Sequence, residues 1–87
     1  MRDNYLTDSV IASDEAIRLY TQLYDERKVA GVADNLAMCW RNKALALKDK
    51  EKAREALKKG LDVIEMLEED YPGEGQATKR TLQTTRI

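Results

Sequence analysis

The chain has 87 residues, of which 15 are basic and 16 acidic, so its net charge is −1. This balance excludes a strong overall field for nucleic acid or an anionic membrane. The lack of histidine removes the commonest metal ligand and general base. With 6% aromatic residues and no phenylalanine, the core must be built mainly from small aliphatic residues. We therefore expect one all-α domain over 1–87.

The first predicted helix covers about residues 8–28. Ser13, Asp14 and Glu15 either cap a helix that begins there or lie on the surface of a longer one. Leu6, Val10 and Ile11 either continue this helix or form a separate short one, and we favour a single helix. Its apolar residues recur at steps of three and four, which is typical of one helical face: Ala16, Ile17, Tyr20, Leu23 and Tyr24.

Gly31 is the predicted break before a second helix over about residues 32–47. This segment carries a stripe of small and aliphatic residues around one large side chain, Trp40. Lys48, Asp49 and Lys50 then form a short polar turn, a usual length for a connection between two helices. The residues of the stripe are Ala33, Leu36, Ala37, Trp40, Ala44 and Leu47.

The third predicted helix, about residues 51–71, has the most regular pattern in the chain. Leu61 and Val63 widen its apolar stripe, and Pro72 with Gly73 ends the helix because proline cannot continue the hydrogen-bond ladder. The stripe follows steps of four and three through Ala53, Leu57, Gly60, Ile64, Leu67 and Tyr71.

The tail, residues 75–87, is open to two interpretations. Ala77, Leu82 and Ile87 fit a short capping helix, whereas its four threonines are poor helix formers and fit a disordered terminus.

These stripes predict a packing seam between the helices. Its small residues let two helices approach closely, while its large residues fill the space between them. The predicted seam consists of Tyr20, Trp40, Ala44, Ala53, Leu57, Gly60, Leu61 and Ile64.

Charge is distributed unevenly along the second and third segments. Residues 41–59 contain eight basic and three acidic residues, and residues 61–74 contain six acidic and no basic residues. This order opposes the dipole of the third helix. We interpret it mainly as a solvated helix surface, and charge pairing between antiparallel copies is the alternative.

The second and third segments resemble the tetratricopeptide (TPR) repeat. Ala37, Trp40, Arg41 and Ala44 occupy motif positions of its first helix, and Ala53 and Leu57 those of its second. Arg41 replaces the usual glycine, Ala44 replaces a large aromatic residue, and Pro72 comes about two turns late.

Ala16 and Tyr20 are similar to the second helix of a preceding repeat. Ala53 lies 37 positions after Ala16, against a standard period of about 34. The stretched period resembles the longer repeats of kinesin-light-chain-type proteins.

The resemblance implies about one and a half repeats, whereas a solenoid generally needs around three to bury its core. The uncovered apolar faces are then expected to pair with a second copy, as a homodimer, or with further repeats of a longer array. We prefer the homodimer.

The expected function is a non-enzymatic protein–protein interaction that uses self-association, peptide binding or both. In some TPR proteins a clamp binds a carboxyl terminus. Asn42 matches the asparagine of that clamp, but Met38 stands where its lysine would be. A peptide groove is still predicted, lined by Asn35, Met38, Asn42 and Leu45; its alternative is a plain surface or dimer contact.

No catalytic, metal or cofactor residue is predicted. The acidic stretch 68–75 lacks the ligand spacing of a calcium loop and is interpreted as a helix end, and Cys39 as a small core residue rather than a reactive thiol. The alternative function is a helical-bundle regulator or nucleic-acid-associated protein that uses residues 41–59. Nucleic acid is the less expected partner because the adjacent acidic half repels phosphate.

No run of apolar residues approaches the roughly 18 needed to span a bilayer. The first ten residues carry acids where a signal peptide would carry basic and then apolar residues. We therefore expect a cytoplasmic protein without membrane contact.

Overall fold

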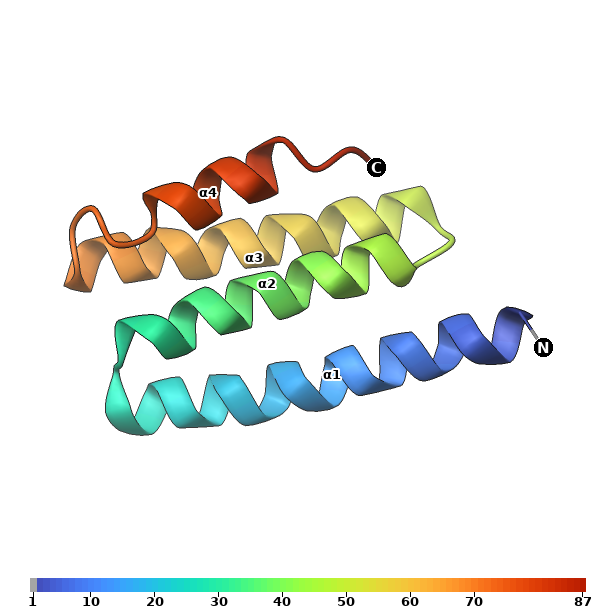
Figure 1. Ribbon diagram of the computed structural model, residues 1–87, viewed down its shortest axis with the longest axis horizontal. Helices are drawn as coiled ribbons and strands as arrows, with labels where there is room; N and C mark the ends of the chain where they lie inside the picture. The colour runs from blue at the N-terminus through green and yellow to red at the C-terminus, as the bar shows by residue number, and fades with distance from the viewer. Residues whose placement is uncertain (1) are drawn as a thin grey trace.

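The computed structural model describes the backbone of residues 2–87 and the side chains of residues 9–87. Within this part of the chain there are four helices and no strand (Figure 1), which confirms the all-α fold class. The helices are α1 (Arg2–Arg27), α2 (Ala30–Ala46), α3 (Lys50–Asp70) and α4 (Gln76–Gln83).

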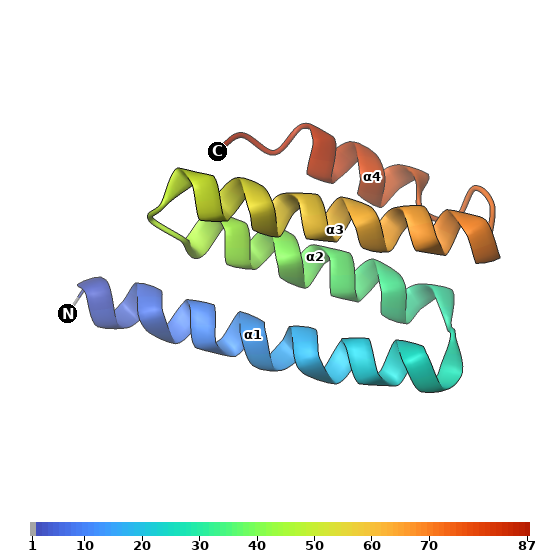
Figure 2. The ribbon, with the colours of Figure 1, turned by 180° about the vertical axis from the view of Figure 1, so that it is seen from behind.

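The helices form a flat antiparallel layer with dimensions of 42 × 26 × 16 Å. Figures 1 and 2 both show α2 between α1 and α3, with the short α4 beside α3. α1 packs against α2, α2 and α3 form a helical hairpin, and α4 contacts both helices of that hairpin. α2 is therefore the central helix, with a neighbour on either side.

α1 is one continuous helix that begins at Arg2, earlier than the predicted start near residue 8. Residues 13–15 consequently lie in its interior and do not cap it. Asp14 instead pairs with Lys43 of α2, with 2.7 Å between Oδ1 and Nζ.

The break between α1 and α2 lies at Lys28, and the prediction of a break at Gly31 was wrong, since Gly31 lies inside α2. Lys28 adopts the left-handed conformation, with φ of 54°. Its backbone N–H donates to Tyr24 O at 2.8 Å, a closing bond of the kind that ends many helices. Val29 is then extended and occupies the N-cap position before α2.

Local capping explains both ends of α3. The Asp49 carboxylate accepts hydrogen bonds from the backbone N–H of Glu51 (2.9 Å) and Lys52 (3.2 Å), which satisfies donors in the first turn. After α3, the Glu68 carboxylate accepts from the N–H groups of Gly73 (2.7 Å) and Gly75 (3.0 Å). Glu68 thus fixes the turn that leads into α4.

The core has two clusters along the hairpin. One is formed by Tyr24, Ala33, Ala37, Ile64, Leu67 and Leu82, and the other by Ala44, Ala53 and Ala56. Leu57 packs against both clusters. Of the predicted seam, Ala44, Ala53, Gly60 and Ile64 are buried, whereas Tyr20, Trp40, Leu57 and Leu61 are partly buried.

Gly60 marks the closest approach of α3 to its neighbours. A Cβ atom there would lie 2.6 Å from Leu82 Cδ2, 3.1 Å from Trp40 Cβ and 3.2 Å from the backbone oxygen of Ala37. The first distance is too short for any real contact, and the last involves backbone, which cannot move aside alone. Glycine is therefore required for α2 and α4 to pack on α3 as they do.

Gly60→Ala is predicted to destabilise the fold by about 1–3 kcal/mol, because the added methyl group forces α4 and α2 away from α3. Gly31→Ala is the matched control: it is also helical, but a Cβ there meets nothing within 4 Å. The control should be neutral or gain up to about 1 kcal/mol from helix propensity. Urea unfolding followed by circular dichroism measures both, and equal stability of the two variants would contradict the required close approach.

Candidate functional site

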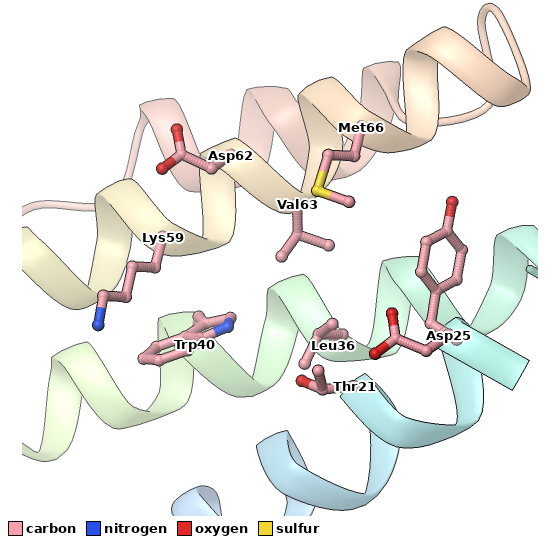
Figure 3. Close-up of a pocket in the computed structure, with 9 residues that line it drawn as sticks. Thr21, Asp25, Leu36, Trp40, Lys59, Asp62, Val63 and Met66 are labelled. Carbon is pink, nitrogen blue, oxygen red and sulfur yellow. The ribbon is translucent and has the colours of Figure 1, made fainter.

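An open groove runs along α2 between α1 and α3. Its first part is a cavity of about 250 Å³, shown in Figure 3. Leu36 and Trp40 of α2 form its floor, and Val63 and Met66 line the α3 side. The other lining residues are Thr21, Tyr24 and Asp25 of α1, with Lys59 and Asp62 of α3.

A second cavity of about 300 Å³ continues toward the end of α2. It shares Trp40 and Lys59 with the first, so the two cavities adjoin at these residues, and we name them together the interhelix groove. The remaining residues that line this part are Val10, Lys43, Leu47, Lys52, Glu55 and Ala56.

Trp40 lies where the two parts of the groove meet. The ammonium groups of Lys43 and Lys59 lie 5.3 Å and 5.2 Å from the centre of its ring, within the range of cation–π attraction. Lys43 is held in turn by its ion pair with Asp14. Two cations thus border the indole, which remains only partly buried, and its uncovered part offers an apolar surface to an incoming side chain.

The two ends of the groove carry opposite charges. Lys43, Lys52 and Lys59 outnumber the acidic residues in the part near the end of α2, namely Glu55 in the lining and Asp14, which pairs with Lys43. The part near the start of α2 is lined by Asp25 and Asp62 together with the shared Lys59. Asp70 accepts a hydrogen bond from Tyr24, which also lines this part. The unevenness noted in the sequence is therefore also present along the groove.

Tyr24 closes the acidic end by joining α1 to α3. Its hydroxyl donates a hydrogen bond to Asp70 Oδ2 at 3.1 Å, and Lys28 Nζ lies 5.0 Å from its ring centre. Burial, followed by the hydrogen bond to Asp70 and its negative charge, raises the pKa of Tyr24 above 10.0. The neutral phenol is therefore the form that the fold favours.

The four residues predicted to bind a peptide do not line the interhelix groove. At 100° per residue, Asn35, Met38, Asn42 and Leu45 lie on the side of α2 turned away from Leu36 and Trp40. Asn35 and Asn42 are exposed, Leu45 is 50% exposed, and Met38 packs partly against the core. They form a separate surface of α2, whose binding role stays a prediction.

Sequence reasoning assigned Trp40 and Leu36 to a buried stripe and did not identify Met66 or Asp25 as lining residues. Met66 lies outside the regular stripe of α3 and is 50% exposed. It stands one turn after Val63, and this apolar pair beside the core stripe is the signal that could have indicated a second apolar surface.

Other predicted features have local roles in the described residues. Glu68, in the acidic stretch 68–75, is bonded to turn amides. Burial raises the pKa of the Cys39 thiol, which lowers its reactivity at neutral pH. No group of three or more His, Cys, Asp or Glu side chains suited to a metal occurs among these residues.

None of the helices in the described part of the chain combines the length and hydrophobicity needed to cross a membrane. Comparisons of the chain with protein-family models, curated proteins and solved structures found no significant match.

The fold is predicted to lose stability as the pH rises above about 10. Because its pKa is raised, Tyr24 keeps its proton in the folded protein at a pH where the phenol of the unfolded chain loses it. The stability that this provides is complete at pH values below the pKa of the unfolded phenol. It is lost as the pH rises through the pKa of Tyr24 in the folded protein. Tyr24→Phe should make the loss shallower, and Tyr20→Phe, in the same helix, is the control. The measurement is the free energy of unfolding in urea from about pH 8 to about pH 11; parallel losses in all three proteins would contradict it.

Proposed function

We propose that the chain is a non-enzymatic protein–protein interaction module of the TPR type, which binds a segment of a protein partner. The observation that carries this proposal is the interhelix groove. An open apolar channel with a partly buried tryptophan, bordered by charged residues, has the features of a protein-binding surface. Aromatic anchors of this kind dominate the binding energy at many interfaces.

The packing of the hairpin supports the TPR assignment. Small residues belong where the two helices of a TPR repeat approach each other, and Gly60 of α3 lies against Ala37 of α2. Ala44 and Ala53, which match motif positions, share one alanine-rich cluster with Ala56. In this assignment α1 is the second helix of a preceding repeat, and the groove separates the second helices of successive repeats.

Self-association through α1 is a second candidate, because this helix carries exposed apolar residues. Leu19 is 58% exposed and Ile11 51% exposed. Ala12, Ala16, Leu19 and Leu23 follow steps of four, three and four, so an antiparallel copy of α1 can place its leucines over these alanines.

The nucleic-acid alternative has less support because several of its basic residues are engaged within the protein. Arg41 Nε donates to Thr85 Oγ1 at 2.9 Å, Lys43 pairs with Asp14, and Lys59 lies over Trp40. These cations do not form a free row along one face.

A pair of substitutions tests the groove as the binding surface. Met66 and Leu45 are both 50% exposed, but Met66 lines the groove and Leu45 belongs to the other surface of α2. Met66→Asp is expected to reduce partner recovery from the native lysate at least about tenfold, about 1.4 kcal/mol, while Leu45→Asp recovers the same proteins as the parent chain. Quantitative mass spectrometry of the bound fractions measures both. The reverse result would assign binding to the surface formed by Asn35, Met38, Asn42 and Leu45.

Leu19→Asp tests self-association. If α1 pairs with a second copy, this change should convert a dimer into a monomer in light scattering while helicity is retained, because the exposed side chain contributes little to the core. A parent chain that is monomeric at micromolar concentration rules out self-association under those conditions and leaves the groove proposal unaffected.

A further inference from the structure

We propose that the occupant of the interhelix groove is an amphipathic helix of a partner protein, acidic in its N-terminal half and basic in its C-terminal half, that lies parallel to α3. This inference rests on the interaction function proposed above. It adds the conformation, the charge order and the direction of the bound segment.

The lining of the groove favours a helix over an extended peptide. α1, α2 and α3 bound the channel, and the described residues contain no strand whose edge could pair with a peptide backbone. The lining near Trp40 is largely apolar, namely Leu36, Val63 and Met66. An extended segment would leave N–H and C=O groups unpaired there, at a cost in free energy. A helix bonds these groups internally and presents only its side chains.

The floor of the groove sets the length of this helix. It follows α2 from Leu36 to Leu47, about 17 Å at the rise of a helix. That distance corresponds to about three helical turns. Apolar residues at positions i, i+3 or i+4, and i+7 of the partner would then lie over the floor, with the central one against Trp40.

The charges set the direction of the bound helix. α3 begins at the basic end of the groove, near Lys52 and Lys59, and finishes at the acidic end, near Asp70. Lys28 lies beside Tyr24 at the acidic end and Lys59 also lines that part, but the three carboxylates of Asp25, Asp62 and Asp70 outnumber these two cations. An acidic N-terminal half and a basic C-terminal half are also the order that the helix dipole favours. Such a helix pairs with both ends of the groove only when it runs parallel to α3.

A second copy of this chain suits the groove less well. The exposed side of α3 outside the groove lining is charged, through Lys58, Glu65 and Glu69. α1 has acidic residues both at 14–15 and at 25–26, so it does not change from acidic to basic along its length. Neither helix offers both an apolar stripe and the required charge order.

Two synthetic peptides test the inference. Each is about 14 residues long, roughly four turns, with the same composition, the same apolar positions and no tryptophan. One carries its acidic residues first and the other carries its basic residues first. Trp40 is the single tryptophan of the protein, so its fluorescence reports binding in the groove directly. The acidic-first peptide is expected to bind at least about tenfold more tightly at low salt, a difference of about 1.4 kcal/mol.

A charge-exchanged protein adds a second, independent measurement. The double variant Lys52→Glu with Asp25→Lys reverses one charge at each end of the groove, which largely cancels the charge difference between the two ends. It should therefore remove most of the preference between the peptides. The matched control is Lys58→Glu with Glu26→Lys, which makes the same changes on the same helices at exposed positions outside the groove lining. The control should keep the parent's preference.

The remaining outcomes separate this inference from the proposed function. Equal binding of both peptides, or a preference for the basic-first peptide, overturns the inferred direction and leaves an interaction module. If neither peptide binds while Met66→Asp still loses the natural partner, a helical occupant is wrong and the groove is retained. If no partner is captured either, both proposals fail. A change in Trp40 fluorescence on dilution of the protein alone would identify a second copy as the occupant.

Discussion

The close approach of α2 and α3 at Gly60 is the constraint on which the rest of this fold depends. Because residue 60 has no side chain, α3 comes near the backbone of Ala37, and Leu82 of α4 can enter the same space. Leu82 is fully buried there, together with Ile64 and Leu67. A small chain without phenylalanine thereby gains a closely packed core from short side chains, since packing density rather than residue size provides the contacts.

Helix positions could be predicted well where apolar periodicity and capping coincide. In α3, Asp49 caps the start and Pro72 follows the end, and the observed helix lies within a residue of the predicted bounds at each end. The start of α1 could not be placed in the same way, because its first turns carry no distinct stop or start signal. The turn at Lys28 also escaped prediction. A lysine in the left-handed conformation has no sequence signature, whereas the nearby Gly31 does.

The candidate site was predictable only in part, because it depends on tertiary arrangement. Trp40 stood out as the single large residue of its segment, but sequence periodicity does not say which side of a helix its neighbours leave open. α1 and α3 flank the side of α2 that carries Trp40, whereas α4 packs near another side, where Thr85, just after α4, accepts a hydrogen bond from Arg41. The division of α2 into a groove floor and a separate surface around Asn42 follows from these placements.

Gly60 also links the two faces of the helical layer. Leu82 reaches it from the C-terminal helix, and Trp40, whose ring lines the groove, lies against it from α2. Displacement of either neighbour changes the space left to the other. A ligand that displaced Trp40 on entering the groove would therefore also change the free energy of docking the C-terminal helix, and linkage would make the two effects equal.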